Sequence, residues 1–277
     1  LRGNRLIMIL YKYMSFQSAS KVMKNSSIGF SCLEDLNDPF EGTAICFEES
    51  DTLSSKLQKN PHRNRLSRNY GVLSLTRNPL NPLMWSHYGD DHRGVVIGID
   101  MKKANLLDEN SCVIPAQYGE IVYTSTMPQN MLPTSSAESL MSVGTEYKCF
   151  RHHNYDLFKN AFLLKDLTWG YEEEVRVVKN INGSQKSRYS ACEFENEAGK
   201  WNQVTILGRP LYCLSIPKES IVEAYLGCSS YSNVTHLGMN EDDYRNIRKA
   251  WQSSGVNVQL VRRKEGTWNL EVSDYKI

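Results

Sequence analysis

The sequence predicts a single α+β domain in which helices flank a mixed or antiparallel sheet. Short runs rich in Val, Ile, Leu and Tyr recur along the 277 residues and are separated by turn residues, a pattern typical of strands. Only a few segments place apolar residues at the i, i+3 and i+4 spacing of a helix. No internal repeat, heptad pattern or low-complexity linker divides the chain, so one domain over residues 8–277 is the simplest organisation.

The composition excludes several classes of protein. Apolar residues make up 40% and charged residues 23% of the chain, as in ordinary globular proteins. The net charge of +1 creates no overall field that would favour nucleic acid or a membrane surface. No apolar run reaches the roughly 18 residues that a membrane-spanning helix requires. The seven cysteines are widely spaced and include no C-x-x-C pair, which favours reduced thiols in a cytoplasmic protein over disulfides or a zinc site.

The sequence of residues 9–32 predicts two strands with a short helix between them. Residues 1–7 precede Met8, a natural start, and are interpreted as a remnant of protein expression or a disordered leader. Residues 9–13 alternate as a strand, residues 18–24 have helical spacing, and residues 28–32 form a second apolar run.

A turn follows the second predicted strand. Asn37-Asp38-Pro39 is a strong turn signal, because a residue before proline is pushed into extended geometry. Side-chain hydrogen bonds within the turn account for Asn37 and Asp38 without any function. Glu41 follows the turn and is either a surface residue or a candidate site residue.

A polar region separates this turn from a central strand. Residues 51–58 predict a helix, and residues 60–69 form a basic loop or helix that is either solvated or faces a ligand. Residues 71–76 read as a buried strand in which Ser74 and Thr76 share one face.

Four aromatic or imidazole rings cluster after this strand. A helical turn over residues 84–88 leads to a buried strand over residues 95–100. The turn and the following loop carry Trp85, His87, Tyr88 and His92. These rings are either ordinary structural residues or one wall of a ligand site.

The remaining elements are read in the same way. Residues 155–165 predict an amphipathic helix, and residues 182–202 predict a polar insertion without regular structure. The predicted strands are 121–123, 204–206, 211–216, 221–226, 256–262 and 268–272, and the further helices are a weak one over 137–141, a turn at 217–220 and one over 241–254 capped by Asn240.

The segment from Thr168 to Val178 is the strongest candidate for a functional site. It predicts a strand with Val on one face and with Glu172, Glu174 and Arg176 on the other. Carboxylates are depleted in strands, and two of them on one face repel each other unless a partner compensates their charge. The segment is therefore either an edge strand with a solvated Glu–Arg pair or a pair of carboxylates at the mouth of a cleft.

Several chemistries remain open on the residues alone. The chain has no G-x-S-x-G, P-loop or G-x-G-x-x-G motif. Convergence of Glu172, Glu174, Asp38 and Glu41 would suit a metal-dependent nuclease. Cleavage of a glycosidic bond to a cationic nicotinamide fits the polar residues better, because a carboxylate stabilises the positive charge that develops on the ribose and an aromatic ring stacks on the leaving group.

Four sequence blocks occur in order along the chain: Leu10-Tyr11-Lys12-Tyr13, Leu36 to Glu41, Leu83 to Tyr88 followed by His92 and Gly94, and Trp169 to Arg176. Together, from residue 9 to the C-terminus, they resemble a bacterial family called domain of unknown function 2971. The family resemblance implies no particular biochemistry.

The order of features is also similar, more distantly, to ADP-ribosyltransferases. That resemblance implies a split sheet, NAD as a substrate, an early strand that contacts NAD, a middle strand that carries Ser or Thr, and a late Glu-x-Glu whose second Glu is catalytic. The corresponding positions are Tyr11, Lys12, Tyr13, Ser74, Thr76, Glu172 and Glu174. The first position lacks an Arg or a His-x-Thr, and the second lacks Ser-Thr-Ser, so the pattern is incomplete.

The leading hypothesis is a cytoplasmic NAD-dependent ADP-ribosyltransferase, a bacterial toxin or phage-defence effector that modifies nucleic acid or protein. Glu174 would stabilise the oxocarbenium ion and Glu172 would orient or activate the acceptor, while the early-strand residues, Trp85, His87 and Tyr88 would line the NAD site. Such a protein would have an antitoxin or defence-system partner. The alternatives are an NAD glycohydrolase, a metal-dependent nuclease, and a non-enzymatic binding or sensor domain.

Overall fold

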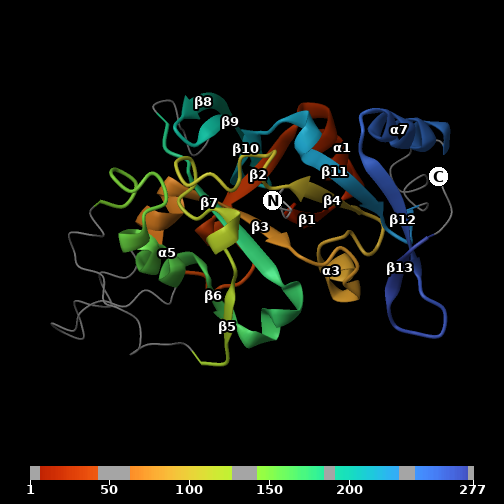
Figure 1. The fold of residues 1–277 in the computed structure, drawn as a ribbon, viewed down its shortest axis with the longest axis horizontal. Helices are drawn as coiled ribbons and strands as arrows, with labels where there is room; N and C mark the ends of the chain where they lie inside the picture. Colours follow the sequence, from red (N-terminus) through yellow and green to blue (C-terminus); the bar gives the residue numbers. More distant parts are fainter. Residues whose placement is uncertain (1–6, 43–62, 127–141, 184–190, 231–240, 274–277) are drawn as a thin grey trace, which may run out of the picture.

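One large mixed sheet organises the protein (Figure 1). The computed structural model describes residues 7–42, 63–126, 142–183, 191–230 and 241–273. In this part of the chain eleven strands form the sheet, in the order β13-β12-β11-β4-β1-β3-β2-β10-β9-β8, with β7 paired to β3, and β5 and β6 form a separate parallel pair. All pairs in the large sheet are antiparallel except β11 with β12, so the predicted α+β class with a mixed sheet is confirmed.

The described elements have the following bounds. The strands are β1 Ile9–Met14, β2 Ser27–Cys32, β3 Tyr70–Thr76, β4 Val95–Asp100, β5 Val122–Thr124, β6 Leu164–Asp166, β7 Glu174–Asn180, β8 Cys192–Asn196, β9 Gly199–Ile206, β10 Arg209–Ser215, β11 Ile221–Leu226, β12 Asn257–Arg263 and β13 Leu270–Val272. The α-helices are α1 Phe16–Asn25, α3 Pro82–His87, α5 Tyr155–Phe162 and α7 Glu241–Ser253, and the 3-10 helices are η1 Leu33–Asp35, η2 Ala116–Tyr118, η3 His152–Asn154, η4 Leu167–Glu172 and η5 Lys218–Ser220.

Helices cover both faces of the sheet (Figure 1). Phe16 of α1 and Trp251 of α7 pack with sheet residues in one core cluster. On the other face, Phe158 of α5 packs with Val72 and Val178, and α3 packs through Trp85 against β1, β4 and β11. Alternation of side chains along each strand produces the two apolar faces, because successive residues point to opposite sides of the sheet.

The sheet is split beside β3. One edge of β3 pairs with β7 over its whole length, from Tyr70 to Thr76. The other edge is shared: β2 pairs only with Gly71 and Val72, and β1 pairs only with Thr76. Strands β1 and β2 therefore diverge from the middle of β3, and a gap opens between them.

The Glu-x-Glu segment differs from the sequence prediction. Residues 167–172 form η4, whose first turn is capped because Asp166 Oδ1 accepts hydrogen bonds from the amide and hydroxyl of Thr168 at 2.9 and 2.7 Å. Glu173 ends the helix with a φ of 45°, and β7 begins at Glu174. The prediction that Glu172 lies on the strand is therefore wrong.

The expectation of a solvated edge strand is also wrong for β7. Its outer edge is bonded by a preceding segment, in which Gly119 O accepts from Arg176 N at 2.8 Å and Ile114 O accepts from Val178 N at 2.9 Å. All seven residues of β7 are buried as a result.

The structure has a β-hairpin within residues 182–202, for which the sequence predicted no regular structure. In the described part of residues 182–202, β8 pairs with β9, and Phe194 lies opposite Trp201 with the two rings stacked at 6.2 Å. Polar residues alternate with these aromatic residues on an exposed hairpin, so its composition resembles that of a loop. The predicted helices over 51–58 and 137–141, and the Asn240 cap, lie outside the described residues, whereas residues 63–69 are helical.

Candidate functional site

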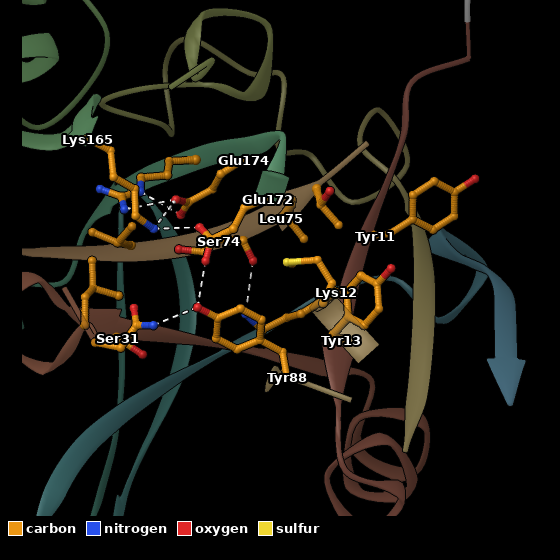
Figure 2. Close-up of a pocket in the computed structure, with 16 residues that line it drawn as sticks. Tyr11, Lys12, Tyr13, Ser31, Ser74, Leu75, Tyr88, Lys165, Glu172 and Glu174 are labelled. Carbon is orange, nitrogen blue, oxygen red and sulfur yellow. Dashed lines mark hydrogen bonds and ion pairs between the residues drawn. The ribbon is translucent and has the colours of Figure 1, made fainter. Parts of the chain in front are cut away.

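A cavity of about 170 Å³ occupies the split between β1 and β2, beside β3 (Figure 2). Strands β1, β3 and β7 supply most of its lining, and β2, β6, η4, the turn after η1 and the end of α3 supply the rest. The lining residues are Tyr11, Lys12, Tyr13, Ser31, Leu36, Asn37, Val72, Ser74, Leu75, Thr76, Met84, Tyr88, Lys165, Glu172, Glu174 and Arg176. Ten of the residues singled out in the sequence therefore border one cavity.

Glu174 and Arg176 form the centre of a buried ionic network. They lie on one face of β7, opposite Thr76 and Ser74 of β3. Arg176 Nε donates to Glu174 Oε1 at 2.7 Å, and the side chains of Arg176 and Glu174 are only 1% and 6% exposed. Because both groups are shielded from water, their interaction is much stronger than that of a surface ion pair.

Lys165 joins Glu172 to Glu174. It enters from β6 and its Nζ donates to Glu172 Oε2 at 2.6 Å and to Glu174 Oε2 at 3.1 Å. The ammonium also lies over the Trp169 ring, 4.8 Å from its centre. One lysine thus compensates the repulsion between two carboxylates that belong to different elements. The sequence contained no local signal for this role of Lys165.

Tyr88 holds the second carboxylate from the other side. Its hydroxyl donates to Glu172 Oε1 at 2.6 Å and accepts from Asn37 Nδ2 at 2.7 Å (Figure 2). Burial and the neighbouring Glu172 raise the pKa of Tyr88, so its hydroxyl stays protonated and continues to donate. These bonds connect α3 and the turn after η1 to η4 at the edge of the cavity.

Glu41 binds the far side of Arg176. Its carboxylate accepts from both terminal nitrogens of the guanidinium, and Arg176 Nη1 also donates to Phe162 O at 2.7 Å. Asp38, in contrast, is a turn residue, because its Oδ1 accepts from Phe40 N at 2.9 Å. Glu41 therefore supports the ionic network, while Asp38 shapes the segment that delivers Glu41.

The charges of this network determine its protonation. Three carboxylates, Glu41, Glu172 and Glu174, face two cations, Lys165 and Arg176, which leaves one negative charge. Burial disfavours the charged form of Glu174, but Arg176 and Lys165 outweigh it and lower its pKa to about 2. Burial likewise opposes the charge of Lys165, yet Glu174 and Glu172 raise its pKa. Glu174 is consequently an anion throughout the physiological range.

Lys12 is the remaining cationic side chain at the cavity. Its Nζ donates to Ser74 O at 3.1 Å, on the edge of β3 that the split leaves open. Burial lowers the pKa of Lys12 to about 8, although the charge of Glu174 acts in the opposite direction.

The rings predicted for a ligand wall separate into two groups. Tyr11, Tyr13 and Tyr88 border the cavity. Trp85 is fully buried in the core under α3, His87 is exposed to solvent, and His92 stacks on Trp85 at 6.4 Å while its Nε2 lies 3.0 Å from Ser86 Oγ. None of these last three residues lines the cavity: Trp85 and His87 point away from it on α3, and His92 lies in the loop after that helix.

Two further properties concern metals and membranes. Among the described residues, no three His, Cys, Asp or Glu side chains are placed to hold a metal ion. In the same part of the chain, each helix is too short or too polar to cross a membrane.

Comparison with known proteins gives one match. Residues 84–177 match the model of a family described as protein of unknown function, DUF2971. This segment begins within α3 and ends in β7, so it contains Tyr88, Lys165, Glu172, Glu174 and Arg176. No curated protein and no solved structure matched the chain. Over residues 84–177 the chain is thus similar to this family of unknown function.

Proposed function

We propose that the protein is an NAD-dependent ADP-ribosyltransferase whose active site includes the cavity in the split sheet. The observation that supports this most directly is the meeting of Glu172 and Glu174 on one cavity wall, where Lys165 bridges them. A buried anion at a cavity wall is suited to a reaction that develops positive charge, because the low local dielectric strengthens their attraction.

In the proposed reaction the bond between the nicotinamide nitrogen and ribose C1′ breaks, and its electron pair leaves with nicotinamide. The ribose becomes an oxocarbenium ion, which the negative charge of Glu174 stabilises. The nucleophile of the acceptor then forms the new bond to C1′ and releases its proton to water. Arg176 and Lys165 keep that carboxylate ionised and fix its orientation. Tyr13 and Tyr88 supply aromatic surface for the nicotinamide ring, and Glu172 orients the nucleophile of the acceptor. The acceptor is a nucleic acid or a protein, and the protein is a toxin or defence effector with a cognate antitoxin or defence partner.

One observation favours a second candidate, a binding or sensor domain without chemistry. Both oxygens of Glu174 and both oxygens of Glu172 already accept hydrogen bonds from side chains of the protein. A closed network of this kind rigidifies a ligand cavity without offering a free carboxylate oxygen. Hydrolysis of NAD by water and metal-dependent cleavage of nucleic acid are the remaining alternatives at the same carboxylates.

Incubation with labelled NAD and a cell extract tests the proposal. Transfer of label and release of nicotinamide by wild type, both lost in Glu174→Gln, would support it. Glu173→Gln is the matched control, because Glu173 stands between the two carboxylates in the sequence but is exposed and outside the cavity. Circular dichroism of each variant separates lost chemistry from lost folding.

The other outcomes identify the alternatives. Nicotinamide release without transfer would identify a glycohydrolase, and nucleic-acid cleavage that a chelator abolishes would identify a nuclease. Saturable NAD binding with neither release nor transfer would favour the binding domain. If wild type shows no turnover or binding of NAD, and Glu174→Gln behaves like wild type, the proposal is wrong.

A further inference from the structure

Lys12, which is half-buried, differs from Lys165 and Lys179, the two buried lysines among the described residues. Lys165 is paired with two carboxylates. Lys179 donates to three oxygens, Ser111 O, Ser111 Oγ and Ala198 O, each at 3.0 Å, which uses all three of its protons. Lys12 has one hydrogen-bond partner among the described residues, the neutral carbonyl of Ser74, and no carboxylate of this part of the chain lies within 4.0 Å.

The position of Lys12 makes its nitrogen available to a ligand. Its side chain lies in the gap between β1 and β2, where the backbone of β3 lacks a neighbouring strand, and it lines the cavity (Figure 2). Two of its three ammonium protons have no partner among the described residues. When no carboxylate compensates the charge of an ammonium group, burial lowers its pKa and increases the fraction of uncharged amine. The uncharged amine is a nucleophile.

We propose that Lys12 is a covalent binding site for small aldehydes or ketones, which its amine captures as a Schiff base inside the cavity. The inference does not depend on NAD chemistry at Glu172 and Glu174. Its ligand is a carbonyl compound small enough for a cavity of about 170 Å³. A ligand with hydroxyl groups fits this cavity, because each oxygen of Glu172 accepts one hydrogen bond from the described residues and has the capacity for a second.

The proposed step is a condensation. The neutral Lys12 nitrogen attacks the carbonyl carbon and forms a carbon–nitrogen bond. The carbonyl oxygen then leaves as water and takes the two amine protons with it, which gives an imine. No oxidation or reduction occurs in this step, and hydrolysis by one water molecule reverses it.

The pKa of Lys12, which burial lowers to about 8, agrees with this role. The ionisable groups that share the cavity with Lys12 are Tyr11, Tyr13, Tyr88, Lys165, Glu172, Glu174 and Arg176. Of these, Glu174 opposes the shift, because a negative charge stabilises the ammonium form. Lys165, in contrast, has a raised pKa because of its two carboxylates and remains an ammonium ion. The same cavity therefore contains one lysine with a lowered pKa and one with a raised pKa.

Reductive trapping tests the proposal on the intact 277-residue chain. The probe is glycolaldehyde with sodium cyanoborohydride, which converts an imine into a stable secondary amine that peptide mass spectrometry locates. Lys21 and Lys24 on α1 are exposed internal controls in the same sample. We expect Lys12 to be labelled at least roughly tenfold faster than either control at pH 7, because a larger fraction of its amine is neutral.

The pH dependence provides a second measurement. Labelling of Lys12 should rise with pH and level off above about 8. Glu174→Gln should shift the Lys12 plateau to lower pH, because it removes the charge that opposes deprotonation. Labelling of Lys12 that is no faster than that of Lys21 and Lys24 at pH 7, or that does not level off above about pH 8, would overturn the inference. This result would leave the NAD proposal untouched.

Discussion

Arg176 and Glu41 lie 135 residues apart in the sequence and meet in the interior through two hydrogen bonds, each from a different terminal nitrogen of the guanidinium. Both side chains are 1% exposed. The same guanidinium holds Glu174 on its other side, so one arginine fixes the turn after η1, the end of α5 and the first residue of β7 around the cavity.

Removal of this arginine should strongly destabilise the protein. Arg176→Met leaves Glu41 without its cation and weakens the compensation of Glu174, and loss of one partner of a buried ion pair costs roughly 3–5 kcal/mol. Urea unfolding measures the change. Lys200→Met is the control, since its pair with Glu195 is 71% and 66% exposed, and we expect a change of less than about 1 kcal/mol. Similar costs for the two variants would show that the network contributes little.

Stability should fall in acid because of Glu174. Its pKa in the folded protein is about 2, below the ordinary value of 4.5 for a glutamate, so its contribution is fully present above about pH 4.5 and is lost as the pH falls through 2. The linked free energy is on the order of 3 kcal/mol. Unfolding free energies measured between neutral pH and pH 2 should therefore decline less steeply in Glu174→Gln than in wild type. Equal slopes would contradict the low pKa.

The packing of β7 against the segment before it should make Gly119 irreplaceable. A Cβ at Gly119 would overlap the carbonyl oxygen of Arg176, a backbone atom that cannot move without breaking the sheet edge. Gly119→Ala should cost roughly 3 kcal/mol or more in unfolding free energy. Gly170→Ala is the matched control, because its Cβ would meet only Leu167 Cδ1 at 3.9 Å, and a thermal melt should show little change. Tolerance of Gly119→Ala would refute the observed approach of the two segments.

Tyr88 should contribute more than an ordinary tyrosine hydroxyl. Its acceptor is the carboxylate of Glu172, whereas the hydroxyl of Tyr155 donates to the neutral carbonyl of Tyr118 at 2.7 Å. Hydrogen bonds to charged groups contribute about 1.5–3 kcal/mol, and neutral ones about 1 kcal/mol. Tyr88→Phe should therefore destabilise the protein more than Tyr155→Phe in chemical denaturation. The reverse order would mean that the Tyr88–Glu172 bond is weak in solution.

Local sequence patterns predicted most strands and the face of the strand on which individual side chains lie. Alternation placed Glu174 and Arg176 on one face of a strand and Val175 and Val177 on the other, which the structure confirms. The turn at Asp38 followed from the proline after it, and its side chain indeed caps the turn. Such features depend on residues a few positions apart, so periodicity and turn chemistry suffice to predict them.

Local patterns failed where a residue's position depended on a cap or on a helical direction. Glu172 lies at the end of η4 because Asp166 caps that helix and Glu173 adopts a positive φ. Trp85 packs into the core and His87 faces solvent, although both belong to one short helix. If a helix or strand begins or ends one residue earlier, the side chain at that position points in a different direction. Sequence patterns do not predict these boundaries to within one residue.

The sequence by itself determined that two carboxylates and an arginine stand close together in a segment next to a strand. Only the tertiary structure decided that they are buried, that Lys165 pairs with the two carboxylates while Glu41 pairs with the arginine, and that they border a cavity with Lys12. The physical reason is that these partners come from separate segments, and strand pairing over long sequence separations brings them together. The pairing of β3 with β7 and the divergence of β1 from β2 bring these residues to one cavity, although no single one of them marks a site in the sequence.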